Sequence, residues 1–239
     1  MSRFLPVERP PLSSPAWFVP YDEHARRVRT AGVTVLLDRF TDGVWLPLED
    51  RPVRTPSAAL VYPGLGRRSD PWGVPPERHR ARFAAPGMLP LYPADGHPFD
   101  AAAVGVEFLV HAYGDTRPPD GATAPRLVRL LPAVSYPYGP GVRTVSGLVR
   151  DAVSRVPVGH ALVETGGWTR DRVAWRERVL TDPQGFFRLA LRFEGERGTA
   201  GGGEVFRLVA TERPGRTGSL SLRLPGDAAL RHVIEIRES

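Results

Sequence analysis

Glycine and proline limit this chain to short stretches of regular structure. The 239 residues include 25 glycines and 26 prolines, about a fifth of the chain, against roughly an eighth in an average protein. Proline blocks a helix interior, and glycine favours turns. With 41% hydrophobic residues, the chain still has enough apolar side chains for a packed core. We therefore expect an all-β fold of many short strands joined by turns.

The first half contains seven short stretches with strand character. Val33–Asp38 alternates β-branched residues, and Asp42-Gly43 is a strong turn signal before Val44–Leu46. The other stretches are Ser57–Tyr62, Arg80–Phe83, Leu89–Tyr92, Val104–Tyr113 and Arg126–Leu131. This spacing predicts an antiparallel β-sandwich over residues 30–131.

The second half repeats this pattern after a short connector. Residues 132–140 are rich in proline and tyrosine, which predicts an extended, semi-rigid linker. Residues 141–239 then predict a second antiparallel β-sandwich. Asp182 and Gly185 bracket a tight turn, after which Phe186 is expected to begin a strand that faces the core. The expected strands are Arg143–Arg150, Ala161–Glu164, Trp175–Leu180, Phe186–Phe193, Val205–Thr211, Leu220–Leu224 and Val233–Ile236.

Residues 1–29 predict a proline-rich extended arm in front of the two sandwiches. The five prolines in this range prevent a helix and disfavour a central strand. The arm also contains Phe4, Trp17, Phe18 and Tyr21. Because a free arm has little use for such side chains, we expect them to pack against the chain's own domain or against a partner.

The second half, from about Arg143 to Ile236, resembles carboxypeptidase regulatory-like domains, which are transthyretin-like β-sandwiches. The matching residues are Val145, Gly147, Val149 and Asp151, then Pro157, Val158, Ala161 and Val163, and finally Thr181–Phe186 with Leu189. The resemblance implies an appended domain that stabilises, spaces or docks other modules and has no catalytic residues. The first half looks like a companion immunoglobulin-like sandwich, although no motif there names a family.

The charge and the missing residue types indicate the kind of organism, the ligands and the cellular location to expect for this protein. All 32 basic residues are arginine and the net charge is +6. The absence of lysine and asparagine indicates a GC-rich bacterial genome. The densest basic run, Glu77–Arg82, is interrupted by an acid and flanked by prolines, which favours a solvated loop or edge strand over a nucleic-acid contact. The first residues lack an apolar signal-peptide core, and no apolar run is long enough to cross a membrane. We expect a cytoplasmic protein that can leave the cell as part of a particle.

No residue pattern predicts a catalytic, cofactor or metal site. The chain has no cysteine, and its histidines lack zinc-binding spacing; His111 and His232 are expected within strands. The carboxylate pairs Asp22-Glu23 and Glu49-Asp50 are expected to be solvated, since neighbours on a strand point to opposite faces. Gly201–Gly203 is expected to form a hairpin loop, because a phosphate-binding loop requires lysine. The six histidines are His24, His79, His97, His111, His160 and His232.

The sequence favours a non-enzymatic structural or adaptor subunit of a larger bacterial assembly. A narrower prediction is a cap or baseplate component of a phage-tail-like contractile injection particle. The alternative is a β-sandwich module that binds a carbohydrate or peptide through tryptophans in loops, and an enzyme with a site assembled from distant residues is the third hypothesis. Partners are expected to be other protein subunits, without nucleic acid, membrane insertion or cofactor. The expected partner-binding residues are Phe4, Trp17, Phe18, Tyr21, Trp72 and Trp168.

Overall fold

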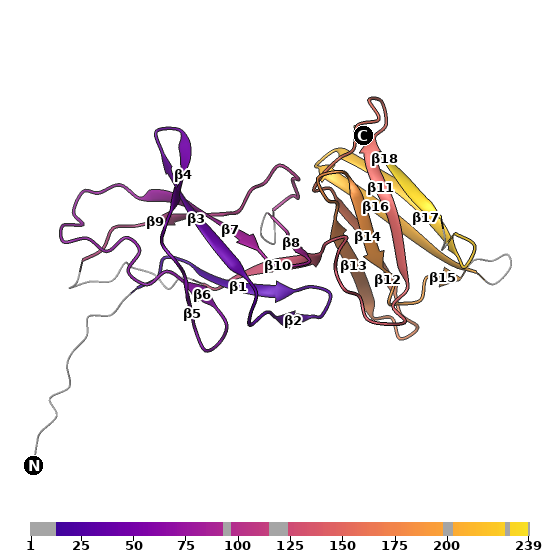
Figure 1. Ribbon diagram of the computed structural model, residues 1–239, viewed down its shortest axis with the longest axis horizontal. Helices are drawn as coiled ribbons and strands as arrows, with labels where there is room; N and C mark the ends of the chain where they lie inside the picture. The colour runs from indigo at the N-terminus through magenta and orange to yellow at the C-terminus, as the bar shows by residue number, and fades with distance from the viewer. Residues whose placement is uncertain (1–12, 93–96, 115–123, 198–202, 228–229, 239) are drawn as a thin grey trace, which may run out of the picture. The chain divides into compact units, whose positions relative to one another are not determined.

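The computed structural model describes residues 13–92, 97–114, 124–197, 203–227 and 230–238, and the regular structure in these ranges is all β-strand (Figure 1). The expected all-β class is therefore confirmed. By its internal contacts the chain divides into two units. Unit 1 comprises Met1–Pro20, Thr34–Phe83 and Gly105–Leu127, and unit 2 comprises Tyr21–Val33, Ala84–Val104 and Val128–Ser239. The domain boundaries expected at residues 30, 132 and 141 stay predictions.

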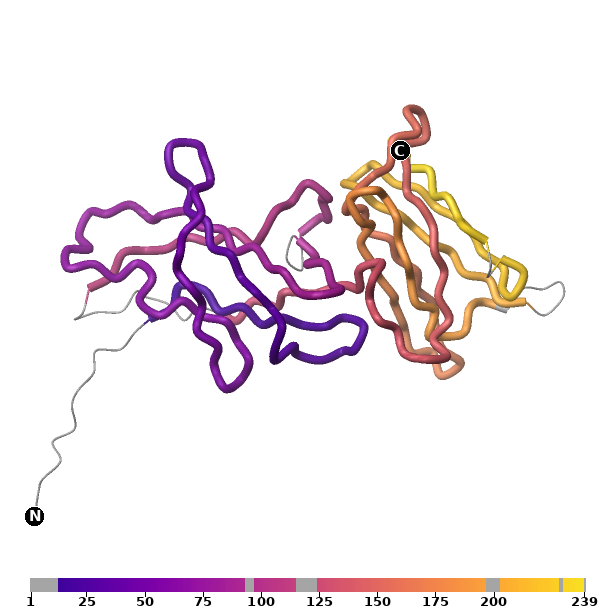
Figure 2. Tube along the Cα trace, viewed as in Figure 1, coloured from indigo at the N-terminus to yellow at the C-terminus, as the bar shows by residue number. Residues whose placement is uncertain are grey.

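Unit 1 contains an antiparallel sheet with the strand order β4-β3-β7-β9. These strands are β3 (Thr34–Thr41), β4 (Val44–Leu48), β7 (Glu77–Ala84) and β9 (Val106–Val110). The β3–β4 hairpin, drawn in indigo, projects from this sheet in Figure 2. In a second group of strands, β5 (Val53–Arg54) pairs with β6 (Leu60–Val61), and β6 pairs with the start of β1 (Trp17–Asp22).

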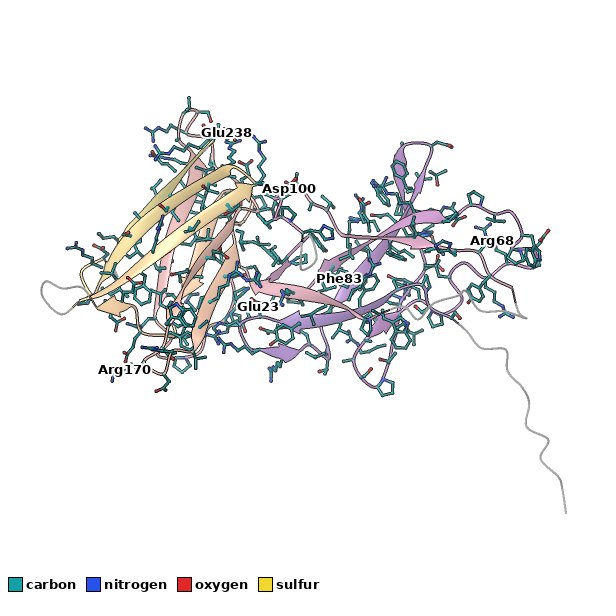
Figure 3. All side chains as sticks on the ribbon, turned by 180° about the vertical axis from the view of Figure 1, so that it is seen from behind. Glu23, Arg68, Phe83, Asp100, Arg170 and Glu238 are labelled. Atoms are coloured by element: carbon teal, nitrogen blue, oxygen red, sulfur yellow. The ribbon has the colours of Figure 1, made fainter. Side chains whose placement is uncertain are left out.

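The core of unit 1 lies between these two groups of strands. Phe18 on β1 packs edge to face on Phe83 of β7 and Phe108 of β9, with ring centroids 5.3 and 5.7 Å apart. Phe83 is labelled in Figure 3. All three rings are buried, and aromatic pairs of this geometry add stability beyond the area they bury. Unit 1 is therefore a two-layered β structure closed by aromatic side chains.

Strand β1 lies within the range that the sequence predicted as an arm, and it is paired despite its proline. Trp17 and Phe18 pair with β6, whereas Tyr21 and Asp22 pair with β2 (Arg27–Val28). Pro20 lies between these two registers. Its missing backbone donor therefore falls where the pairing of β1 passes from β6 to β2.

Unit 2 is built mainly from a sheet with the order β13-β12-β16-β17-β18-β11-β14, with β15 beside β16. The pairing of β11 with β18 is parallel, which differs from the expectation of antiparallel pairs alone. A parallel pair needs a long connection, and here most of unit 2 lies between the two strands. The bounds are β11 (Thr144–Asp151), β12 (Leu162–Trp168), β13 (Ala174–Leu180), β14 (Phe186–Ala190), β15 (Glu196–Arg197), β16 (Glu204–Arg213), β17 (Arg216–Leu224) and β18 (Arg231–Glu238).

The seven strands expected in the second half are all present, and β15 is an addition. Alternate residues of these strands point inward and form one apolar core. Unit 2 also contains β8 (Met88–Pro90), which pairs with the end of β10 (Arg126–Pro132). The largest fully buried core side chains are Phe187, Leu189, Leu191, Phe206, Leu208, Leu222, Ile234 and Ile236.

The tight turn before β14 is confirmed, but the side-chain direction expected after it is wrong. Asp182 Oδ1 accepts hydrogen bonds from the backbone N–H groups of Gln184 and Phe186. Gly185 has a φ of 80°, a conformation that favours glycine. Phe186 is 38% exposed, whereas Phe187 is 1% exposed. Only one of two neighbours on a strand faces the core. Because residues 186 and 187 are both phenylalanine, the sequence pattern did not indicate which of them faces inward.

Candidate functional site

The four expected partner-binding residues of the arm have different environments. Phe18 is fully buried in the core of unit 1, whereas Trp17 and Tyr21 are half-buried on β1. Phe4 lies outside the described residues. Because the Phe18 ring is enclosed by unit 1 itself, it is not available to a partner.

The two tryptophans expected at the surface are exposed. Trp72 of unit 1 lies in a turn and is 87% exposed. Trp168 of unit 2 is 71% exposed and is the last residue of β12 rather than a loop residue. It pairs with Ala174 across the hairpin, beside Val173, which is 61% exposed. Among the described residues, each unit therefore presents one exposed tryptophan to solvent.

The carboxylate pair Asp22-Glu23 is bound by arginines and is not solvated as expected. Asp22 accepts a hydrogen bond from the backbone N–H of Ala25 and lies 3.6 Å from Arg29. Glu23, labelled in Figure 3, has both oxygens occupied: Arg178 Nε lies 2.9 Å from one and Arg129 Nη1 lies 2.9 Å from the other. Burial raises the pKa of Glu23, but the two arginines together lower it below its usual value. Glu49 and Asp50 are exposed, as expected.

A second buried carboxylate, Glu177, lies near a histidine in unit 2. Arg192 donates Nε and Nη2 to the two oxygens of Glu177, at 2.7 and 3.0 Å. The same guanidinium donates to the backbone carbonyl of His24, and the His24 ring packs on Tyr136 and Tyr138 with centroids 5.2 and 5.0 Å apart. Burial raises the pKa of Glu177 more than Arg192 lowers it, whereas burial and Arg192 both lower the pKa of His24.

These groups have the composition of an acid–base site but not its geometry. A general base needs an oxygen or nitrogen within hydrogen-bonding reach of a substrate. Both oxygens of Glu177 and of Glu23 are held by arginines, although His24 Nδ1 has no partner in the described part of the chain. Arg192, two residues after β14, therefore joins the segment at His24 to Glu177 of β13.

Two further expectations concern histidines and membrane spans. His232 lies in β18, as expected, and its Nε2 is 3.0 Å from the carbonyl oxygen of Asp227. His111 follows β9 and is exposed, so the strand there is shorter than expected.

Among the described residues, no group of three or more histidines and carboxylates is placed to hold a metal ion. The same residues form no helix of the length and apolarity that crossing a membrane requires.

The basic run at Glu77–Arg82 forms most of β7, which lies between β3 and β9 and is therefore neither a loop nor an edge strand. Its alternate residues Arg78, Arg80 and Arg82 share one side of the sheet. Arg80 lies over the Trp45 ring at 4.4 Å, and Arg78 lies over the Phe40 ring at 5.1 Å.

Acidic residues neutralise much of this arginine row. Asp38 accepts hydrogen bonds from Arg80 and Arg82, and Glu107 accepts two from Arg78. The row thus combines arginines with aromatic rings, a feature of nucleic-acid surfaces, while its positive charge is already balanced within unit 1. We assign it a structural role in the sheet.

A different arginine-rich surface covers the outer side of β14, β11 and β18 in unit 2, which we call the β18 face. In the register of the three strands, Phe186, Leu148 and Val233 lie side by side, and Arg188, Ser146 and Arg231 form the neighbouring row. On the other side of the apolar row, Arg150 pairs with Glu235, and their side chains are 2.7 Å apart. The outward residues of β18 are Arg231, Val233, Glu235 and Arg237.

A hollow of about 660 Å³ continues the β18 face toward β16 and β17. It is lined by Arg207 and Val209 of β16, by Ser219 of β17, and by Glu235 and Arg237 of β18. Within the described part of the chain, Arg207, Arg231 and Arg237 form no ion pair. The Arg231 guanidinium lies over the Phe186 ring, 5.8 Å from its centroid. The sequence contained a signal for this face, since arginine, valine and glutamate alternate with buried residues from 231 to 237.

No family model and no curated protein matches this chain. A streptococcal ancillary pilin resembles it with 14% identity over 94% of this chain and 62% of the pilin, at a TM-score of 0.28. BcpA, the major pilin subunit of Bacillus cereus, resembles it with 9% identity over 92% of this chain and 68% of BcpA, also at 0.28. The chain thus spans less than two thirds of the streptococcal pilin. These likenesses are too weak to support an argument, and the resemblance to carboxypeptidase regulatory-like domains stays a prediction.

Proposed function

We propose that this chain is a non-enzymatic structural or adaptor subunit that docks onto other protein subunits of a larger bacterial assembly. The observation that supports this most directly is the exposure of Trp72 and Trp168, at 87% and 71%. Tryptophan is strongly enriched among the residues that contribute most to protein–protein binding. Each ring leaves a large apolar area in water, and a partner that covered it would gain the corresponding hydrophobic free energy.

The non-enzymatic part of the proposal is supported by the way the buried acids are used. Asp38, Glu23 and Glu177 are each held by arginine side chains through two or more hydrogen bonds. A carboxylate held in this way positions strands. Its oxygens already accept hydrogen bonds from arginine and are not free to accept a proton from a substrate.

The narrower form of the proposal is a cap or baseplate component of a phage-tail-like contractile injection particle, made in the cytoplasm and released with the particle. It rests on an analogy of architecture, namely two β-rich units in one chain. Imaging of the isolated assembly by electron microscopy tests it: a contractile sheath supports it, and any other particle removes it.

A second candidate function is the binding of a carbohydrate or peptide, and it is favoured by the same tryptophans. An exposed indole offers a flat apolar face on which a sugar ring can stack. This reading requires no partner subunit. The two functions therefore differ in one measurable property, the native mass of the protein in the cell lysate.

The test compares the full-length protein with the double variant W72A/W168A in cleared lysate and after purification. We expect the wild type to run in a large complex and the variant to run near its mass of 26.2 kDa. The control is V44A, which shortens another apolar side chain that is 58% exposed and lies on β4, away from both tryptophans in the sequence. A wild type that runs as a monomer in the lysate overturns the proposal. Glycan binding that W72A/W168A abolishes would then establish the second candidate.

A further inference from the structure

We propose that the β18 face is the surface on which an acidic protein partner docks. The inference rests on the proposed function, for which it names the chemistry of the partner and the place of contact. Its first support is the charge of the face. Six arginines surround one glutamate, Glu235, which leaves an excess of five positive charges on a chain whose net charge is +6. The six are Arg150, Arg155, Arg188, Arg207, Arg231 and Arg237.

The excess charge is available to a partner. Arg150 and Arg155 both contact Glu235 and share its single negative charge. Arg207, Arg231 and Arg237 are exposed and form no ion pair among the described residues. Glu238 also lines the hollow but is paired with Arg213, so this pair leaves the balance unchanged. Guanidinium groups without an anion are suited to bind carboxylates in pairs of parallel hydrogen bonds.

The apolar row in the middle of the face favours a protein over a nucleic acid. Phe186 and Val233 are each 38% exposed, and Leu148 lies between them. Protein interfaces combine an apolar centre with a charged rim and are enriched in arginine. A single-stranded nucleic acid would need several aromatic rings for its bases, whereas Phe186 is the one aromatic ring that the described residues place on this face.

The apolar surface extends beyond the strands into the loop after β11. Val153 and Val156 are 90% and 59% exposed. The loop conformation is fixed, because Asp151 Oδ1 accepts hydrogen bonds from the backbone N–H groups of Val153 and Ser154. Arg155 of the same loop reaches Glu235 on the β18 face. The partner would therefore meet a preorganised surface, which lowers the entropic cost of binding.

The experiment uses the full chain and poly-L-glutamate as an acidic polypeptide probe. The face variant R207Q/R231Q/R237Q is compared with R27Q/R51Q/R172Q, which removes three other exposed arginines and gives the same net charge. At about 50 mM salt, where surface charges are weakly screened, we expect the face variant to bind at least about tenfold more weakly and the control within about twofold of the wild type. Circular dichroism and thermal unfolding establish whether both triple variants are folded. If the face variant does not fold, the single variants R207Q and R231Q are measured in its place.

Three results would overturn the inference. Equal weakening by both variants would mean that binding follows net charge and has no defined surface. Tighter binding of single-stranded DNA or heparin than of poly-L-glutamate would assign the face to another class of ligand. A large complex in lysate that the face variant leaves intact would place docking elsewhere and keep the proposed function. A wild type that is monomeric in lysate would instead remove the proposed function, whatever the probe shows.

Discussion

Asp38 and Arg82 form a bidentate ion pair across 44 residues of sequence, with Arg82 Nε and Nη2 at 2.7 and 2.8 Å from the carboxylate oxygens. Arg80 adds two hydrogen bonds to one of these oxygens. Asp38 is 2% exposed because the arginine side chains cover it. The pair fixes β3 to β7 on the outer side of the unit 1 sheet.

Replacing Asp38 leaves two arginines side by side without their shared carboxylate. We expect D38N to lower the free energy of unfolding by about 2 kcal/mol, since removal of one partner of a covered ion pair is costly. Urea denaturation measures this. The control is E194Q, whose partner Arg170 is 71% exposed; it should change stability by less than about 0.5 kcal/mol. Equal effects of the two variants would contradict a special role of Asp38.

Glu177 should make the protein less stable as the pH rises. Burial holds the pKa of Glu177 above its usual value of 4.5, and Arg192 offsets this only in part. The folded state then keeps a proton that the unfolded state has lost, so stability falls with increasing pH from about 4.5 through the folded pKa. In urea titrations between about pH 4 and 8, the stability of the wild type minus that of E177Q should decrease. An increase would show that Arg192 dominates over burial.

Glu23 should show the opposite dependence. Burial raises its pKa, but Arg178 and Arg129 outweigh this and lower it below 4.5. The stability that ionised Glu23 contributes is complete above pH 4.5 and is lost as the pH falls through the folded pKa. The wild type minus E23Q difference should therefore rise toward pH 4.5 and stay level above it, a profile that calorimetry at a series of pH values can measure. A difference that keeps falling above pH 4.5 would rule out the lowered pKa.

Gly147 is required by close packing in the core of unit 2. A Cβ at this position would lie 2.6 Å from two ring atoms of Phe187 and 2.7 Å from the carbonyl oxygen of His232. G147A should therefore destabilise the protein by about 1–3 kcal/mol through overpacking. The matched control is G139A, since a Cβ at Gly139 meets nothing within 4 Å. Chemical denaturation of both variants checks this, and a neutral G147A would mean that the Phe187 ring moves freely.

Phe18 should behave as a core residue of unit 1. F18A removes a fully buried ring that packs on Phe83 and Phe108, and we expect a loss of about 3–5 kcal/mol. W72A removes an exposed ring of similar size and should change stability by less than about 0.5 kcal/mol. A shift in the melting temperature of F18A no larger than that of W72A would contradict the buried position. It follows that deleting residues 1–29 would also remove part of the core.

The second half was more predictable from sequence than the first because its signals are local. Its strands end at turns such as Asp182–Gly185, where side-chain and backbone requirements fall within a few residues. In the first half, β1 was not predicted as a strand, because Pro20 argues against one and its pairing with β6 joins residues far apart in the sequence. The parallel register of β11 and β18 also joins the first and last strands of the second half of the chain, and no local pattern contains that information.

The sequence by itself determined the all-β class and the exposure of Trp72 and Trp168. Proline, glycine and alternating apolar residues act within a few positions of one another, so their effect can be read without the fold. Only the tertiary structure decided which arginines are neutralised. Arg82 meets Asp38 and Arg178 meets Glu23, 44 and 155 residues away, whereas Arg207, Arg231 and Arg237 form no ion pair among the described residues. An ion pair depends on which strands lie together and in which register, and long-range pairing sets both.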